Sequence, residues 1–176
     1  MDNEKSINIL MERLFKFGHQ KIALLNVHKS FNYGHQRKVA YEDFHKKHNM
    51  QLNPNYYQES LEQMTSVGSK LTKKILNLKD PPTAIICSQD KYFIGCLQEC
   101  QKRGLEVPKD ISLVGYNDHD NYLSSQNLTF ISHPLAEMGK MAVEILEKIE
   151  NGVAPKKLSK LIEPILNKGK SDKKIN

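Results

Sequence analysis

The stretch TAIICSQDKYFIGCLQECQKRGLEVPKDISLVGY, residues 83–116, contains a predicted strand, a helix and a second strand in that order. Residues 83–88 and 111–116 are short and almost continuously apolar, which is typical of strands covered on both faces. Between them, residues 90–103 carry apolar side chains at helical spacing and end at Gly104. Two such strands joined by a helix predict parallel neighbours in one sheet, with a right-handed crossover.

The same alternation of strands and helices extends along the rest of the chain. KIALLNV (21–27) is a third apolar run, and residues 161–166 look extended, with Pro164 indicating a sheet edge or a crossing segment. The fold class is therefore α/β, with an open parallel sheet flanked by helices. The other predicted elements are helices at 3–17, 33–48, 67–78 and 135–150 and strands at 56–61 and 129–133.

Length and composition indicate a soluble protein with room for one ordinary domain or two small lobes in its 176 residues. No apolar run approaches the ~20 residues that span a bilayer. The start, MDNEKSINIL, lacks the basic and apolar parts of a signal peptide, so we expect a cytoplasmic protein with no membrane partner. Cys87, Cys96 and Cys100 have no further ligands at zinc spacing, so neither a metal nor a disulfide is expected.

The positive charge is concentrated at the C-terminal end. Residues 155–176 hold seven lysines against Glu163 and Asp172, which accounts for five of the six net positive charges. We expect residues 168–176 to form a solvated tail, which alone would give no sequence-specific binding of nucleic acid. His45 and His48 are three residues apart on a predicted helix, and we expect them on its polar face rather than in a metal site.

Polar side chains come directly at the ends of three of the predicted strands. Asn26 and His28 end the first, residues 88–90 (Ser-Gln-Asp) follow the second, and residues 117–120 (Asn-Asp-His-Asp) follow the third. Ligands of open parallel sheets bind beyond the carboxyl ends of the strands, so these groups are candidates for a ligand site. Helix and turn capping is the alternative for the aspartates. No phosphate loop or nucleophile elbow is present, so we do not expect an enzyme.

Residues 81–120, PPTAIICSQDKYFIGCLQECQKRGLEVPKDISLVGYNDHD, resemble the C-terminal core of lactose-repressor-type (LacI/GalR) transcription regulators. Further pieces resemble the family in the same order along the chain. They are DNEKS (2–6), FGHQKIALL (17–25), Arg37 with Ala40 and Tyr41, and LTFISHPLAEMGKMAVEIL (128–146). Each piece alone is moderately specific, whereas the ordered series is specific and covers almost the whole chain.

The resemblance implies a type-I periplasmic-binding-protein-like fold. It assigns residues 1–133 to the C-terminal lobe of the effector-binding domain and 134–160 to a return helix that would pack on the N-terminal lobe. Residues 161–176 would be the final extended segment and the basic tail. The helix-turn-helix headpiece and most of the N-terminal lobe of family members have no counterpart in this sequence.

The function implied by the resemblance is the effector-binding and dimerisation part of a DNA-binding transcription regulator. It would sense a small molecule, a sugar or a related metabolite, without a cofactor. It would form a homodimer, and DNA would be contacted only through a headpiece that this chain does not contain. The alternative is a free-standing solute- or sugar-binding protein of the same fold.

The resemblance also suggests roles for single residues. Arg37 matches the family's ligand-clamping arginine, whose fork can hold two hydroxyls or a carboxylate. Gln89 stands where the family usually has an effector-binding Asn, and Asn117 where sugar-responsive members have Asp, so an atypical effector is expected. Asp90 and Asp118 are interpreted as capping residues.

A dimer interface is implied on the helix that follows the 83–88 strand. Phe93, Ile94 and Leu97 fall on the family helix that packs between subunits, and Tyr122 lies in a loop near it. Plain core packing is the alternative for each of them, because one helix can turn one face to the sheet and another to a partner.

Overall fold

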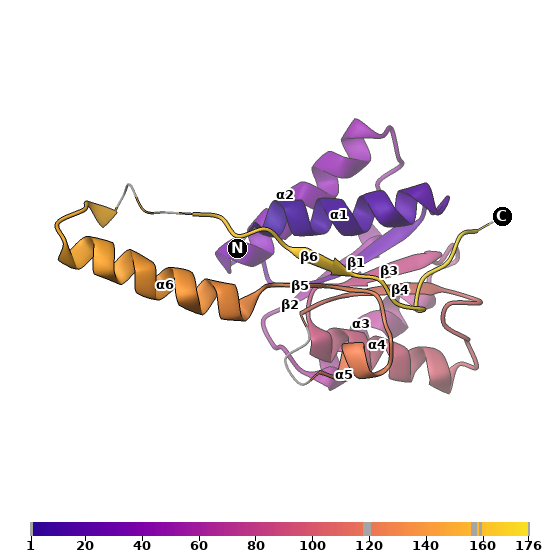
Figure 1. Cartoon of the computed structure of the whole chain (residues 1–176). Helices are drawn as coiled ribbons and strands as arrows, with labels where there is room; N and C mark the ends of the chain where they lie inside the picture. Colours follow the sequence, from indigo (N-terminus) through magenta and orange to yellow (C-terminus); the bar gives the residue numbers. More distant parts are fainter. Residues whose placement is uncertain (1, 118–120, 156–157, 159, 176) are drawn as a thin grey trace.

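The computed structural model describes residues 2–117, 121–155, 158 and 160–175. Thirteen helices and strands follow one another in these ranges (Figure 1). They are α1 (Asn3–Lys16), β1 (Ile22–Val27), α2 (Asn32–Lys47), the 3-10 helix η1 (Pro54–Tyr56), β2 (Tyr57–Ser60), α3 (Thr65–Leu76), β3 (Ala84–Cys87), α4 (Asp90–Lys102), β4 (Ser112–Tyr116), α5 (Tyr122–Ser125), β5 (Phe130–Ser132), α6 (Leu135–Glu150) and β6 (Ile165–Asn167).

The strands form one six-stranded sheet in the order β2-β1-β3-β4-β5-β6. All neighbours are parallel except β6, which pairs antiparallel with β5. In the register of the central strands, Ile86 lies opposite Leu24 on one side and opposite Val114 on the other. The predicted α/β fold with a parallel sheet is confirmed. The extended segment with Pro164 leads into the edge strand β6, as its sequence indicated.

Helices cover both faces of the sheet, which explains the continuously apolar strands (Figure 1). Ile22 and Leu24 of β1 point to the core under α1 and α2, whereas Ala23 and Leu25 point to the core under α3 and α4. Because successive residues of a strand face opposite sides, both sets are removed from water. All six residues of β1 are buried.

Helices α3 and α4 cross at close range through two glycines. A Cβ placed on Gly95 would lie 2.0 Å from the carbonyl oxygen of Thr65, and one on Gly68 would lie 2.6 Å from that of Tyr92. Neither position can carry a side chain without moving backbone, so these glycines set the spacing of the helix layer on this face.

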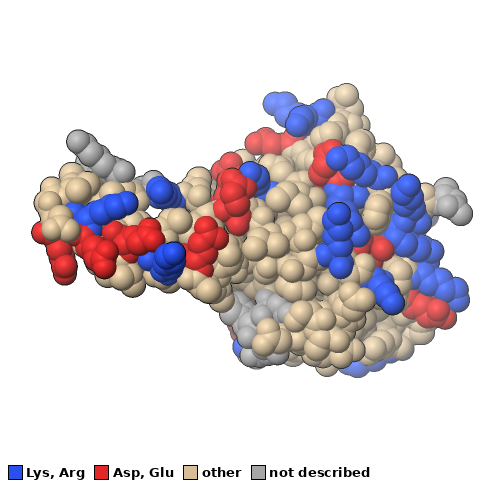
Figure 2. All heavy atoms as spheres, in the orientation of Figure 1, with Lys and Arg blue, Asp and Glu red and all other residues tan. Residues whose placement is uncertain are grey.

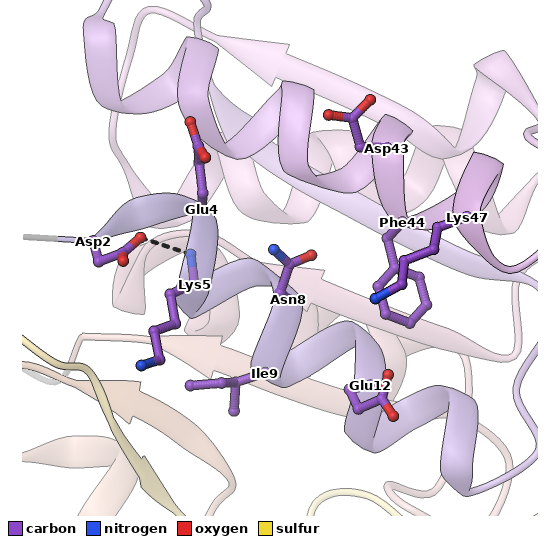
Figure 3. A pocket seen from close by; sticks show the side chains of 9 residues that line it. All are labelled: Asp2, Glu4, Lys5, Asn8, Ile9, Glu12, Asp43, Phe44 and Lys47. Atoms are coloured by element: carbon purple, nitrogen blue, oxygen red, sulfur yellow. Dashed lines mark hydrogen bonds between the residues drawn. The ribbon is translucent and has the colours of Figure 1, made fainter.

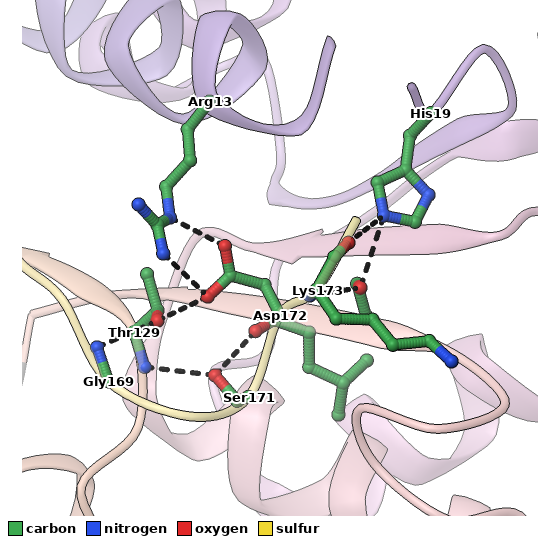
Figure 4. Close-up of polar contacts among 9 residues, drawn as sticks. Arg13, His19, Thr129, Gly169, Ser171, Asp172 and Lys173 are labelled. Carbon is green, nitrogen blue, oxygen red and sulfur yellow. Dashed lines mark hydrogen bonds and ion pairs between the residues drawn. The ribbon is translucent and has the colours of Figure 1, made fainter. Parts of the chain in front are cut away.

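The prediction of a solvated tail at 168–176 is wrong, because part of this segment is docked on the body (Figure 4). Asp172 is 7% exposed, and its carboxylate accepts hydrogen bonds from Arg13 Nε and from the Thr129 hydroxyl, both at 2.5 Å. Ser171 is also buried, and its hydroxyl donates to the backbone of β4 at 2.7 Å. Lysines dominate the composition of the segment, but its buried side chains, Ser171 and Asp172, lie between them, and backbone groups such as those of Lys173 also bond to the body.

Helix α6 leaves the body and projects away from it (Figure 1). None of its residues is buried among those that the structure describes. Its apolar side chains are largely open to solvent, with Leu135 67%, Val143 56% and Leu146 60% exposed. Charged side chains also lie along α6, while lysines and arginines gather at the opposite end of the body, toward the C-terminus (Figure 2).

His45 of α2 and His48, which caps its C-terminus, do not lie on a polar face as predicted. His45 is 2% exposed and its Nδ1 lies 2.8 Å from the carbonyl oxygen of Tyr41. His48 is half-buried and stacks on the ring of Phe44, with ring centroids 4.2 Å apart. An imidazole is partly apolar, so its place on a helix does not follow from polarity alone.

Candidate functional site

The start of α2 is held against the carboxyl end of β1, and this places Arg37. The buried Asn26 donates a hydrogen bond to the carbonyl oxygen of Gly34 at 2.8 Å. A Cβ on Gly34 would lie 2.5 Å from the carbonyl oxygen of His28, so glycine is required for this close approach. Arg37 follows three residues later, within the next turn of the same helix.

Arg37 is 2% exposed and lies between the ends of β3 and β4. Its Nη1 donates to the carbonyl oxygen of Ser88 at 3.0 Å, and its Nε donates to the amide oxygen of Asn3 at 3.2 Å. The guanidinium carbon lies 3.8 Å from the ring centre of Tyr116 and 5.3 Å from that of Tyr33. Burial lowers the pKa of Arg37 from its ordinary value, but a guanidinium remains charged at neutral pH.

The other two predicted effector residues are chain neighbours of residues that contact this guanidinium. Gln89 follows Ser88, whose carbonyl accepts from Arg37, and Asn117 follows Tyr116, whose ring lies beside Arg37. Asn117 has a φ of 65°, a left-handed conformation that Asn tolerates better than most residues. Three positions far apart in sequence therefore lie at one edge of the sheet. Their roles in binding stay predictions.

Asp90 and Asp118 are the two aspartates interpreted as capping residues. Asp90 lies in the first turn of α4, is 7% exposed, and has one carboxylate oxygen 2.7 Å from the backbone nitrogen of Lys91. A carboxylate in the first turn also suits the positive end of the helix dipole. Asp118 lies outside the residues that the structure describes.

Sequence reasoning missed the polar chain that surrounds Arg37. The Tyr116 hydroxyl donates to the amide oxygen of Asn3 at 3.1 Å, and Nε2 of His133 lies 3.2 Å from the Tyr116 oxygen. Asn3 also donates to Gln36 at 2.8 Å, which fixes its amide from the other side. Asn3 and Tyr116 are 113 residues apart, so no spacing in the sequence could have paired them.

The predicted dimer residues fall into two groups. Phe93 is fully buried in the core between α4 and the sheet. This residue therefore packs in the core and has no surface left for a partner. Ile94, Leu97 and Tyr122 are only half-buried; Leu97 and Tyr122 pack at the border of that core. These three have surface left for a partner, and their place in an interface stays a prediction.

A groove lies on the outer side of α1 and α2 (Figure 3). This groove of about 570 Å³ has apolar residues Ile9 and Phe44 among charged neighbours such as Glu12, Asp43 and Lys47. None of the three predicted effector residues lines it. It combines apolar surface with charges of both signs, and it is separate from the cluster around Arg37.

The described residues contain no cluster of three or more His, Cys, Asp or Glu that could hold a metal ion. Cys87, Cys96 and Cys100 are free and buried, and burial raises the pKa of the Cys96 thiol. A thiol of this kind is poorly reactive. Among the described helices, none is both long and apolar enough to span a membrane.

Known proteins match this chain both in sequence and in fold. Residues 11–171 match the family model of the periplasmic binding protein-like domain. The ribose operon repressor of Haemophilus influenzae is 33% identical over 142 residues, which are 78% of this chain and 42% of that protein. The HTH-type transcriptional repressor CytR of Escherichia coli (strain K12) is 27% identical over 147 residues, 83% of this chain and 43% of CytR.

A solved regulatory protein of the LacI family from Chloroflexus aggregans has the same fold. It superposes with a TM-score of 0.89 at 26% identity, over 97% of this chain and 62% of that structure. The chain thus spans less than half the length of the two repressors and less than two thirds of the solved regulator.

Proposed function

Because the chain belongs to the periplasmic binding protein-like domain family, in the form found in LacI-type transcription regulators, we propose that it is the effector-sensing part of such a regulator. The observation that carries the proposal is the buried Arg37 at the carboxyl edge of the sheet, where it contacts Ser88 and Tyr116, the residues that precede Gln89 and Asn117. Ligands of open α/β sheets bind at this edge. Two repressors among the relatives support a regulator rather than a free-standing solute-binding protein.

The proposed effector is a small hydroxylated metabolite, such as a sugar or a related compound. Arg37 would donate from its fork to hydroxyl oxygens or to a carboxylate. Gln89 and Asn117 are neutral amides that can both donate and accept, so they suit an effector with mixed donors and acceptors. The name of one relative, the ribose operon repressor, makes ribose a reasonable first compound to test.

The effector would act by changing the angle between this lobe and a second one. In this proposal, residues 134–160 pack on that second lobe, which would cover the apolar face of α6 that is exposed here. A ligand shifts such an equilibrium only through its different affinity for the two arrangements. The protein would act in the cytoplasm as a homodimer through Ile94, Leu97 and Tyr122, and would contact DNA only through a headpiece outside this chain.

The first experiment is to sequence the genomic DNA upstream of the Met1 codon and read it in this frame. A continuous frame that encodes a helix-turn-helix would support the proposal and would supply the protein for operator-binding assays. A stop codon directly upstream would contradict a DNA-binding role for this gene product. The effector-binding part would then be tested on the chain alone.

Effector binding is tested with ribose and a panel of related sugars by ligand-observed NMR, which detects millimolar affinity. Arg37→Lys keeps the charge but removes the planar fork, so we expect a loss of about tenfold or more in affinity for any sugar that binds. Arg103→Lys on α4 is the matched control, because Arg103 bonds Glu99 and Asn77 at another place. Equal affinity of the Arg37→Lys and Arg103→Lys variants would contradict the proposed site.

A further inference from the structure

Tyr116 supports Arg37 in two ways. Its ring lies 3.8 Å from the guanidinium carbon, within the range of a cation–π contact, which is strongest where water is excluded. Its hydroxyl and Arg37 Nε also share one acceptor, the amide oxygen of Asn3. A turn of the Tyr116 side chain would therefore weaken both supports of the arginine.

The direction of each hydrogen bond in this cluster follows from Arg37. Arginine Nε can only donate, so the Asn3 atom that faces it is the amide oxygen. That oxygen carries no proton, so the Tyr116 hydroxyl must give its single proton to Asn3. The Tyr116 oxygen can then only accept from Nε2 of His133. His133 is therefore held with a proton on Nε2.

The second ring nitrogen of His133 is left without a hydrogen-bond partner. His133 is 8% exposed, and its Nδ1 is buried and unpaired. A second proton there would be a buried donor without an acceptor, close to the charge of Arg37. Burial first and the Arg37 charge second lower the pKa of His133. Among the described residues, the titratable or charged groups that act on this ring are Tyr116, through its hydroxyl and ring, and Arg37, through its charge.

We propose that His133 is a positioning residue for Arg37 that acts through Tyr116: the neutral imidazole holds the arginine in place, and the protonated imidazole releases it. The imidazolium would be a second buried cation beside the Tyr116 ring. It would repel the guanidinium of Arg37, which lies on the same ring. His133 lies between the end of β5 and the start of α6, so the same proton would act where α6 leaves the body. The consequence for effector affinity, a fall as the pH falls, rests on the proposed function.

The test follows the Nε–H group of Arg37 by NMR in the ¹⁵N-labelled chain, together with the ring nitrogens of His133. We measure the protection of Nε–H from exchange relative to an unstructured arginine, which removes the intrinsic pH dependence of exchange. In the wild type we expect protection to fall about tenfold as the pH is lowered, because repulsion by the imidazolium would weaken the hydrogen bond from Arg37 Nε to Asn3. Its midpoint should coincide with the titration of the His133 ring.

Two variants separate the donor from the charge. His133→Gln keeps an N–H donor for Tyr116 but cannot be protonated, so Arg37 should stay protected at every pH. His133→Phe keeps a ring but loses the donor, so Arg37 should be about tenfold less protected at every pH. His45→Phe is the matched control, because His45 is also buried against a tyrosine ring, 4.4 Å from Tyr41, on the helix of Arg37. It should leave the Arg37 profile unchanged.

Any of three results would overturn the proposal. The first is wild-type protection of Arg37 in His133→Phe, the second is a wild-type profile whose midpoint lies apart from that of the His133 ring, and the third is a His133→Gln profile that falls with pH as the wild type does. If His133→Phe does not fold, the wild-type profile and His133→Gln still decide. No effector is needed, so an intact coupling in a chain that binds no sugar would count against the proposed function only.

Discussion

Helices α1 and α6 have similar apolar periodicity in the sequence but opposite surroundings in the structure. Six residues of α1 are buried, among them Ile7, Leu10 and Leu14, while α6 has no buried residue. The period of 3.6 residues shows which face of a helix is apolar, but it does not show what covers that face. In α1 the cover is the sheet and α2. In α6 it would have to come from protein outside the described residues.

The largest effect on the free energy of unfolding should come from a substitution in α1, the buried helix of the two. Leu10→Ala in α1 removes a side chain that is fully buried and leaves a cavity, so we expect a loss of about 2–5 kcal/mol in the free energy of unfolding. Leu146→Ala in α6 removes the same atoms from a side chain that is 60% exposed, and should cost less than about 0.5 kcal/mol. Urea denaturation of both variants measures the difference. Equal losses would show that α6 is packed in solution.

The C-terminal segment contrasts with α6 in the opposite sense, since it has a polar sequence but is docked. Asp172→Asn breaks an ion pair whose carboxylate has no exposed surface and leaves Arg13 without its partner, so we expect a loss of about 3 kcal/mol. Lys174→Gln on the same segment is the control and should change stability by less than about 0.5 kcal/mol, because Lys174 is exposed. A small loss for Asp172→Asn in urea denaturation would mean that the segment is detached in solution.

These contrasts show which parts of the fold can be predicted from the sequence and which cannot. The sheet was predictable because strands buried on both faces give apolar runs, and β1 and β3 are such runs. The docking of Asp172 was not, because Arg13 is 159 residues away and only the folded chain brings the two together. A charge pattern describes a segment as a whole, whereas docking here depends on two buried side chains, Ser171 and Asp172, and on backbone hydrogen bonds that composition does not show.

The site was predictable only in part for the same reason. Arg37, Gln89 and Asn117 were found through the resemblance and through the rule that polar strand ends meet at one edge. Tyr116 and His133 were predicted only as residues at the ends of the strands 111–116 and 129–133. Their hydrogen bonds link α1, β4 and the end of β5. Contacts between elements so far apart in the sequence leave no periodic pattern from which they could be predicted.

A smaller effect should appear when the pH is lowered. Burial is the first cause that lowers the pKa of His19, His45 and His133 in the folded chain. Between these folded values and the unfolded value of about 6.5, the unfolded chain binds more protons, so stability should fall as the pH falls through this window. Urea denaturation from about pH 7 to pH 5 measures the slope. His45→Phe should reduce it, and a slope unchanged by that variant would exclude His45 as a contributor.

The smallest effect on stability is expected where α6 is changed on its exposed apolar face. Leu146→Glu should alter the free energy of unfolding by less than about 0.5 kcal/mol, because Leu146 packs on no core within the described residues. It should nevertheless lower any self-association of the chain at high concentration, since Leu135, Val143 and Leu146 form apolar surface open to a second copy. Sedimentation equilibrium of the two proteins measures this, with the exposed Glu147→Gln as control. A wild-type chain that stays monomeric at high concentration would show that a second copy does not cover this face. The proposed second lobe would then be the partner that covers it.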